Sequence, residues 1–390
     1  MGVRGQASLF AQGPAGKLEA EREGWEQVTL FVENGSPPDL HDRSRRAGWL
    51  LLAATLVATL AMSMLPAPYV IDQPGPTYDA LGEVTVGEET VSLITAGSEE
   101  YPVSSELRIT TVTRLGNPES LPSWWAVLEA WLSRQKSVQP VDSAFPPGVS
   151  FEEGREAARI DMENSQQEAI AAALTALGIP YSSHLEVVAV VEGGASEGVL
   201  EAGDILRVAS GEQLQDVTRL RELIRLNGAQ QGLPLVVDRD GRELTLEVIP
   251  RIEDNPEQPV IGVLVAGRYD FPVDVSIELE NVGGPSAGLV FALGVMEKLT
   301  PEQEIPDGVF AGSGTITASG DVGAVGGIQH KAFGASAAGA TVFLVPRDNC
   351  QALGGLQIEG MAIVPVSTLD EALEVFDLIE SGQTLPSCSG

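Results

Sequence analysis

The sequence predicts a mixed α+β protein held to a membrane by one N-terminal helix. Three observations lead to this prediction. Residues 47–65 form an apolar run without charge, residues 185–250 alternate strand-like runs with turns, and residues 271–299 place a strand, a glycine-rich turn and an apolar helix in succession. This order is typical of a membrane-spanning helix followed by a β-rich domain and an α/β domain.

The length and charge of the chain limit its possible functions. Its 390 residues allow two or three domains of ordinary size. Its 23 lysines and arginines stand against 55 acidic residues, and a net charge of −32 would repel a nucleic-acid backbone. The 3 histidines and 2 cysteines lack the spacing of a zinc or haem site. We therefore expect no metal, no cofactor and no nucleic-acid partner.

The apolar run is long enough to cross a bilayer. As a helix, residues 47–65 would span about 28 Å at ~1.5 Å per residue. A cleaved signal peptide is the alternative, but residues 1–46 precede the run, which is longer than the ~7 to 15 apolar residues of a signal sequence. We expect residues 47–66 to be a retained anchor and residues 1–46 to be a disordered tail.

The charges beside this run predict its orientation. Arg43, Arg45 and Arg46 precede the run, whereas Asp72 is the first charged residue after it. Positive charges remain on the cytoplasmic side of a membrane. We expect a single-pass protein of the cell membrane, with its tail in the cytoplasm and everything after Leu65 outside.

Residues 67–180 form a predicted membrane-proximal segment that mixes strands and helices. Strand-like runs cover Glu83–Ile94 and Glu106–Val112. The amphipathic run Trp124–Leu132 has two interpretations, a core helix or a helix resting on lipid. The apolar spacing over Glu152–Leu177 predicts one long helix or two short ones.

Residues 181–253 form the predicted β-rich domain. The stretch includes a small residue, Ala195, before a turn, the run Leu200–Leu206 (LEAGDIL), a predicted helix at Val217–Leu226 and a hairpin signal at Asp240-Gly241. In this order they resemble a PDZ domain, which captures peptide ends by adding a strand to a sheet edge.

The PDZ resemblance also implies a position for the peptide-binding loop. The loop that holds the peptide carboxylate would be Leu177-Gly178-Ile179. Pro180 follows directly and has no backbone N–H with which a pairing strand could begin.

The sharpest local motif surrounds Ser286. Residues 281–288 read NVGGPSAG, between an alternating strand and an apolar helix, and Pro285 suits the first helical position. Backbone donors at such a helix start can hold an oxyanion. Gly284-x-Ser286-x-Gly288 also fits the nucleophile elbow of α/β-hydrolases, but His330 is the sole later histidine and lies too close to the end of the chain for that fold. A simple helix start of small residues is the remaining alternative.

A lysine supplies the base that this serine lacks. Lys331 lies about one turn into a predicted helix opened by Gly326-Gly327, in alanine-rich surroundings. A helix N-terminus and burial both disfavour the ammonium form. Lowering the lysine pKa from ~10.4 to about 7 or 8 costs about 3 to 5 kcal/mol, which a packed domain can sustain.

Together these motifs, 45 positions apart by residue number, resemble the serine–lysine proteolytic domain of the Lon family over about residues 262–376. The resemblance implies that Ser286 is the nucleophile, Lys331 the general base and Ser313 a hydroxyl that supports the lysine. It also assigns Gly284 and Ala287 to the support of the serine turn. Strand Thr341–Pro346 and Asn349 resemble the family's next strand and helix start.

Two features depart from the Lon pattern. Gly283 stands where Lon enzymes commonly carry an acidic residue, and no phosphate-binding G-x-x-x-x-G-K-[ST] motif occurs. The order anchor, PDZ-like domain and Lon-like domain (residues 254–379) resembles the membrane-anchored PDZ–Lon proteins of bacteria. Residues 380–390 would be a flexible tail.

The remaining features are the histidine beside Lys331 and the two cysteines. His330 lies about 100° around the helix from Lys331 and should point elsewhere. Cys350 and Cys388 lie in a compartment that permits a disulfide, and whether they pair stays open.

The resemblance implies an ATP-independent serine endopeptidase outside the cytoplasm that cleaves exposed or unfolded protein segments. The alternative is a non-catalytic, membrane-anchored PDZ scaffold that binds protein termini. Lon-type domains generally close into rings, so we expect a homo-oligomer, most plausibly a hexamer. The partners would be protein or peptide substrates and, through residues 47–66, the lipid membrane.

The orientation is testable by cysteine labelling in intact cells. A cysteine introduced just after Leu65 should react with a membrane-impermeant reagent, because that side lies outside. A cysteine introduced before Arg43 should react only after the membrane is broken. The reverse pattern would invert the predicted topology.

Overall fold

The computed structural model describes residues 40–87, 89–97, 103–145, 151–252, 259–279, 282–301 and 303–388. Most of the predicted tail, residues 1–39, lies outside these described residues. The chain divides into two compact units, Met1–Ala58 and Thr59–Gly390.

Helix α1 (Leu40–Met64) contains the apolar run. Its portion Ser44–Met64 has a mean hydropathy of 1.8 over its most apolar window, and that window is 0% buried. Within the described part of the chain, α1 is the one helix that meets the length and hydropathy criteria for a membrane span. The helix begins at Leu40, ahead of the predicted anchor start at residue 47.

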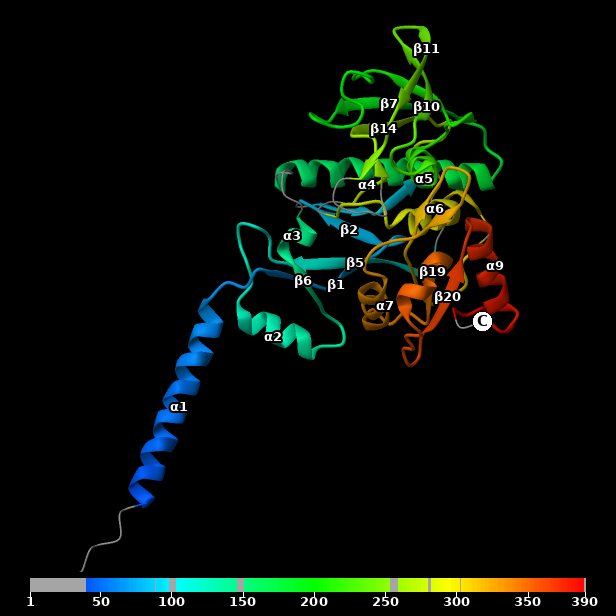
Figure 1. The fold of residues 1–390 in the computed structure, drawn as a ribbon. Helices are drawn as coiled ribbons and strands as arrows, with labels where there is room; N and C mark the ends of the chain where they lie inside the picture. Colours follow the sequence, from blue (N-terminus) through cyan, green and yellow to red (C-terminus); the bar gives the residue numbers. More distant parts are fainter. Residues whose placement is uncertain are drawn as a thin grey trace, which may run out of the picture. The chain divides into compact units, whose positions relative to one another are not determined.

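A six-stranded mixed sheet forms the centre of the larger unit (Figure 1). Its order is β20-β19-β16-β5-β1-β6. The strands are β1 (Tyr69–Asp79), β5 (Glu106–Leu115), β6 (Ser137–Pro140), β16 (Val309–Gly312), β19 (Val342–Pro346) and β20 (Ala362–Val366). The four strands from β5 to β20 run parallel to one another, and β1 is antiparallel to both of its neighbours.

The central sheet joins two segments that the sequence analysis treated separately. Parallel pairing of β5 with β16 places Leu107 opposite Phe310, so residues 67–180 supply half of a sheet completed by residues beyond 300. Leu107 is 0% and Phe310 2% exposed, and both belong to one core. Because that apolar surface is buried only when the strands pair, the membrane-proximal segment and the Lon-like segment fold as one layer.

Helices cover both faces of the sheet. On one face pack α4 (Phe151–Ala176), α6 (Gly288–Leu299) and α9 (Leu369–Glu380), and on the other packs α7 (Ile328–Ala337). Neighbouring strand residues point to opposite faces, as Phe310 and Ala311 do by joining different cores. The stretch predicted as one long or two short helices is the single helix α4, and Gly178 (φ 68°) lies just beyond its end.

The PDZ-like region has its own sheet and core above α4 in Figure 1. The strand order is β11-β10-β8-β7-β14. These strands are β7 (Ser182–Val190), β8 (Ile205–Ala209), β10 (Leu233–Arg239), β11 (Arg242–Val248) and β14 (Val263–Asp270), with helix α5 (Val217–Asn227) packed against them. The predicted hairpin at Asp240-Gly241 is confirmed, with φ angles of 54° and 78°.

Strand β14 lies beyond the predicted PDZ boundary at residue 253. It pairs with β7 from Val263 opposite Val190 to Asp270 opposite Ser182, and so forms one edge of the PDZ-like sheet. Its position in sequence, after the apparent end of the domain, concealed this pairing.

Helix α4 separates the two sheets and contacts both regions (Figure 1). Asn164, which is 4% exposed, donates to Val265 O (2.9 Å) and accepts from Gly267 N (2.9 Å) on β14. Glu168 accepts hydrogen bonds from Val217 N (2.9 Å) and Thr218 N (3.1 Å) at the start of α5. These contacts fix the PDZ-like sheet to α4 through backbone groups that water would otherwise satisfy.

The remaining elements are short. The strands are β2 (Glu83–Val86), β3 (Glu89–Ser92), β4 (Ile94–Ala96), β9 (Glu212–Gln213), β12 (Arg251–Ile252), β13 (Pro259–Val260), β15 (Val275–Ile277), β17 (Thr315–Ile316) and β18 (Val322–Gly323). The helices are α2 (Trp124–Leu132), α3 (Val141–Ala144), η1 (Arg347–Asn349) and α8 (Cys350–Leu353).

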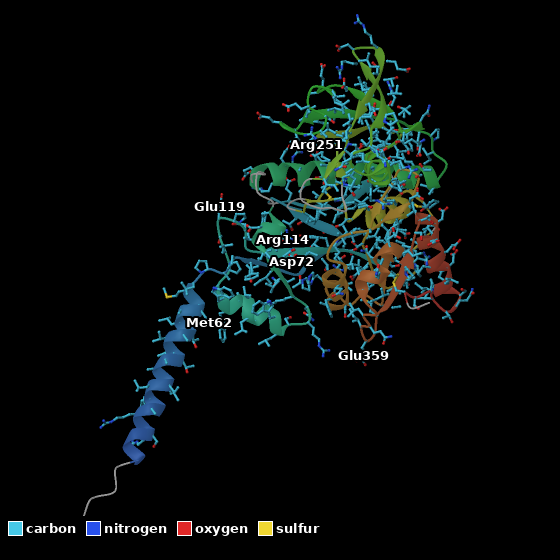
Figure 2. All side chains as sticks on the ribbon, viewed as in Figure 1. Met62, Asp72, Arg114, Glu119, Arg251 and Glu359 are labelled. Atoms are coloured by element: carbon cyan, nitrogen blue, oxygen red, sulfur yellow. A yellow bond between two sulfur atoms is a disulfide. The ribbon has the colours of Figure 1, made fainter. Side chains whose placement is uncertain are left out.

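An ion pair ties the strands nearest the exit from α1. Arg114 on β5 donates through Nε and a terminal nitrogen to the two carboxylate oxygens of Asp72 on β1, at 2.7 and 3.0 Å (Figure 2). Gln139 on β6 donates to the same carboxylate at 2.7 Å. A bidentate pair of this kind adds geometric specificity to the β1–β5–β6 register.

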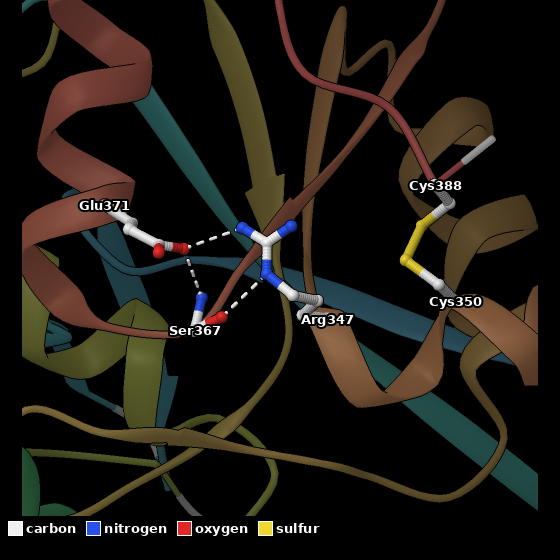
Figure 3. Close-up of a disulfide and its surroundings, with 5 residues drawn as sticks. All are labelled: Arg347, Cys350, Ser367, Glu371 and Cys388. Atoms are coloured by element: carbon white, nitrogen blue, oxygen red, sulfur yellow. Dashed lines mark hydrogen bonds and ion pairs between the residues drawn. A yellow bond between two sulfur atoms is a disulfide. The ribbon is translucent and has the colours of Figure 1, made fainter. Parts of the chain in front are cut away.

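The two cysteines form a disulfide. Cys350 at the start of α8 bonds Cys388 across 38 positions of sequence, which ties the C-terminal segment to the face of the sheet that carries α7 (Figure 3). Nearby, Arg347 donates to Ser367 Oγ at 2.8 Å and to Glu371 at 2.9 Å. The pairing that the sequence left open is therefore present in this structure.

Candidate active site

Ser286 lies in a tight turn that leads into α6. Gly284 has φ 86°, a conformation that glycine adopts without strain, and the helix begins at Gly288. The sequence analysis placed Pro285 at the first helical position, and this prediction is wrong because α6 begins at Gly288. The carbonyl of Ser286 instead accepts hydrogen bonds from Gly314 N and Ser313 Oγ, both at 3.0 Å. Because that carbonyl is committed to the segment after β16, the helix starts later.

Helix α4 supports the other side of this turn. Gly284 N donates to Ala158 O at 3.0 Å, and Ser165 Oγ donates to Pro285 O at 3.0 Å. A Cβ atom at Gly283 would lie 2.9 Å from the Cβ of Ala158. The close passage of α4 thus explains why glycine occupies the position where Lon enzymes commonly carry an acidic residue.

Lys331 reaches the serine from the opposite face. It lies in the first turn of α7, whose N-cap, Gly327, has φ 67°, and it is 3% exposed. Its Nζ is 2.6 Å from Ser286 Oγ and 2.9 Å from Ser313 Oγ. The structure therefore brings together the three side chains that the sequence assigned to the site.

The hydrogen bonds of Ser313 orient the lysine. Ser313 is 0% exposed, and its hydroxyl proton is donated to Ser286 O. Its oxygen can then only accept from Lys331 Nζ. A neutral Nζ that donates one N–H to Ser313 keeps its lone pair available for the hydroxyl proton of Ser286.

Burial provides that neutral form. Removal from water lowers the pKa of Lys331 from 10.5 to about 7. Desolvation is the cause, because it penalises the charged ammonium form. At neutral pH a large fraction of the amine is thus able to accept a proton.

A cavity of about 330 Å³ opens beside Ser286 and Lys331. Two of its walls come from the central sheet, with Pro76 and Tyr78 on β1 and Thr111, Val112 and Thr113 on β5. The remainder comes from the loops around the serine and lysine. Sequence reasoning missed the wall from β1 and β5, and no local motif marked these strands as part of a site. Apart from Lys331, the lining residues carry no charge.

His330 on α7 and Asn349 in η1 (Arg347–Asn349) make structural contacts near the site. His330 points away from the cavity, with Nδ1 2.8 Å from Gln135 O and Nε2 2.9 Å from Ser137 Oγ. Asn349, 6% exposed, bonds both backbone groups of Val325 at 2.9 and 3.0 Å. Asn349 thus fixes the loop that leads to Gly326 in the cavity wall.

Two backbone amides of the predicted peptide-binding loop are hydrogen-bonded to the end of α4. Gly178 N donates to Thr175 O at 3.0 Å and Ile179 N to Leu174 O at 2.8 Å, so both amides close the end of α4. At the sheet edge, the side chain of Asn164 occupies the backbone groups of Val265 and Gly267. No group of three or more His, Cys, Asp or Glu side chains among the described residues is placed to hold a metal ion.

The region around Ser286 and Lys331 is similar to a family of known proteins. Residues 280–378 match the Lon protease (S16) C-terminal proteolytic domain. The Lon protease of Campylobacter concisus is 27% identical over 183 residues, 44% of this chain and 22% of that protein. Lon protease 1 of Bacillus subtilis is 33% identical over 110 residues, which cover 27% of this chain and 14% of that protein. The Lon protease of Clostridioides difficile is 40% identical over 104 residues, which cover 26% of this chain and 13% of that protein. The chain thus spans less than a quarter of each of these relatives.

Solved PDZ domains match a part of the chain. The PDZ domain of an SdrC-like protein from Listeria innocua matches with a TM-score of 0.20 and 18% identity, over 21% of this chain and 92% of that chain. Residues 280–378 are thus similar to the proteolytic domain of Lon S16 proteases, which form a serine peptidase family.

Substitution of the two central side chains tests the site. Ser286→Ala removes the attacking hydroxyl, and Lys331→Arg installs a guanidinium that stays protonated. Each should lower peptide cleavage by on the order of 10⁴-fold or more. Ser313→Ala should cost about 10- to 100-fold, because it removes a hydrogen bond worth about 1–3 kcal/mol. Lys136→Arg, at an exposed ion pair with Glu129, is the matched control and should leave cleavage unchanged. Substantial cleavage by either of the first two variants contradicts the assignment.

The pKa of Lys331 predicts the pH dependence of cleavage. Only the neutral amine accepts a proton, and its fraction rises with pH through the pKa of about 7. With an uncharged peptide substrate, kcat/KM should rise about tenfold per pH unit below that value and level off above it. A profile that is flat from about pH 5 to about pH 9 would exclude Lys331 as the base.

Proposed function

We propose that this chain is a serine endopeptidase that uses Ser286 as nucleophile and Lys331 as general base. The observation that carries the proposal is the 2.6 Å contact between Lys331 Nζ, in a buried amine with a pKa of about 7, and Ser286 Oγ. The match of residues 280–378 to the Lon S16 proteolytic domain supports the same reaction. No comparable observation favours a non-catalytic scaffold.

In the first step Ser286 Oγ attacks the carbonyl carbon of a peptide bond while its proton passes to Lys331 Nζ. The resulting ammonium gives that proton to the leaving amine as the C–N bond breaks, which leaves an ester between Ser286 and the substrate. A water then gives its proton to the regenerated amine and attacks the ester. Release of the acid returns the hydroxyl to Ser286.

Backbone N–H groups of the serine turn would stabilise the developing oxyanion. Among the described residues, no hydrogen-bond acceptor engages the N–H of Ser286 or Ala287. Both lie immediately before α6, where the helix dipole favours negative charge. This gives Gly284 and Ala287 their supporting role, since they shape the turn that presents these donors.

The cavity defines the class of substrate side chain. Its walls offer the apolar groups of Tyr78, Val112 and Val282 and the hydroxyls of Thr111 and Thr113. A charged substrate side chain would lose its hydration in the cavity without gaining an oppositely charged partner. The exception is an acidic side chain, which could pair with Lys331. We therefore assign to this cavity an uncharged side chain next to the cleaved bond, in an exposed or unfolded protein segment.

The proposed location is the outer side of a cell membrane, with α1 as the anchor. The length and hydropathy of Ser44–Met64 support the anchor, and the arginines before it support a cytoplasmic N-terminus. The Cys350–Cys388 disulfide supports an oxidising compartment for the proteolytic domain.

The decisive experiment is cleavage of an unstructured protein, such as casein, by the purified full chain in detergent without nucleotide. We expect cleavage that added ATP does not increase, since the sequence contains no phosphate-binding motif of that kind. Mass spectrometry of the products should show uncharged residues before the cleaved bonds. Strict dependence on ATP would overturn the ATP-independent mechanism, and an inactive chain would overturn the enzyme assignment.

We also propose that the chain assembles into a ring, most plausibly a hexamer. With a net charge of −32 per chain, subunits repel one another, and salt should strengthen their association by screening. Analytical ultracentrifugation of the detergent-solubilised chain over a range of salt concentrations measures this. A monomer under all conditions would exclude the ring, and dissociation by salt would contradict its electrostatic basis.

A further inference from the structure

Helix α2 exposes several large apolar side chains. Val127 and Ala130 are 0% and 1% exposed and pack in a small core, whereas Trp125, Trp131 and Leu132 are 51%, 58% and 82% exposed. Isolated exposed apolar residues are ordinary, but three on a helix of 9 residues indicate a surface that contacts a membrane or another protein. The single acidic residue of the helix, Glu129, is paired with Lys136 at 2.7 Å.

The start of α2 is tied to the end of α1 by backbone contacts. Ala67 N donates to Pro122 O at 2.8 Å and Trp124 N to Leu65 O at 3.4 Å, and Pro66 forms an antiparallel bridge with Ser123. These residues all belong to the unit that begins at Thr59. Figure 2 marks Met62 in the last turns of α1 and Glu119 in the loop before α2. The helix therefore begins where the apolar run ends.

An aromatic cluster holds the helix in this position. The ring of Tyr69, the first residue of β1, packs edge-on against Trp124 at 5.7 Å and Trp131 at 6.3 Å between centroids. Tyr69 follows Leu65 by a few residues and is half-buried. Because β1 belongs to the central sheet, α2 is attached both to the membrane exit and to the layer that carries the cavity.

We propose that α2 lies in the interfacial layer of the bilayer that α1 spans, with Trp125, Trp131 and Leu132 among the lipid headgroups and upper acyl chains. Tryptophan favours this layer because its ring is apolar and its N–H is polar. Arg134, two residues after the end of the helix, suits anionic headgroups. This inference rests on α1 being a membrane anchor, as proposed above.

The role of this contact is orientation. A helix of 9 residues is too short to bind a membrane strongly alone, but α1 holds it at a high effective concentration beside the bilayer. A second contact with the bilayer then restricts rotation of the proteolytic domain about α1. The cavity beside Ser286 would then face one defined direction relative to the membrane surface, instead of sampling every direction.

Fluorescence quenching by lipids brominated in the upper acyl chain tests the proposal on the full chain in vesicles of phosphatidylcholine and phosphatidylglycerol. The chain has 5 tryptophans (Trp25, Trp49, Trp124, Trp125 and Trp131), and four can be replaced by Phe to leave one reporter. We expect Trp125 and Trp131 to lose fluorescence to an extent comparable with Trp49 in α1. Peptide cleavage by each variant verifies folding.

A matched control places the reporter elsewhere. With all native tryptophans replaced, Leu226→Trp puts a tryptophan at a 64% exposed apolar position of α5, and it should remain unquenched. If Trp49 is quenched and both Trp125 and Trp131 are not, the proposal for α2 is wrong and the face is covered by another partner, such as a second copy of the chain. If Trp49 is also unquenched, the anchor itself is wrong. Quenching of Leu226→Trp equal to that of Trp125 would remove the specificity of the signal and overturn the inference.

Discussion

The burial of the Lys331 amine is the constraint on which the proposed active site depends. An ammonium ion removed from water loses its hydration, and the described surroundings supply hydroxyls rather than a carboxylate to compensate it. The pKa of Lys331 therefore falls to about 7. Several distant segments must pack together to exclude water from one nitrogen, including α7, the Ser286 turn and the strands β1 and β5. Loss of packing in any of them would return the amine to its ammonium form.

Helix α4 connects this site to the PDZ-like region. Ser165 on α4 bonds the carbonyl of Pro285, next to the proposed nucleophile Ser286, while Asn164 bonds the edge of β14. Glu168, one turn further, caps the start of α5. Burial, followed by repulsion from Asp216, raises the pKa of Glu168 above its usual range. The serine turn and the PDZ-like sheet thus share one rigid support, and the sheet edge that could pair with a peptide is held by that same support.

Local features of the fold followed closely from sequence. The hairpin at Asp240-Gly241 was predictable because two residues with positive φ between alternating runs admit few other structures. The end of α4 before Gly178 and the position of Lys331 one turn into α7 were predictable for the same local reason. The start of α6 was not, because a carbonyl of its first predicted turn bonds Ser313 and Gly314, which lie in a remote segment. Likewise, nothing local assigned β14 to the PDZ-like sheet.

The sequence by itself therefore determined the mixed fold class, the apolar helix and the choice of Ser286 and Lys331 as the candidate pair, because these depend on residue type, periodicity and short motifs. The tertiary structure alone decided that residues 67–180 share a sheet with the Lon-like segment, that β1 and β5 line the cavity, and that Asn164 covers the edge of β14. Strand pairing between Leu107 and Phe310 joins positions some 200 residues apart by number, with a whole PDZ-like region between them. Such pairing is selected by the apolar surface that it buries across the complete chain, and no window of neighbouring residues contains that information.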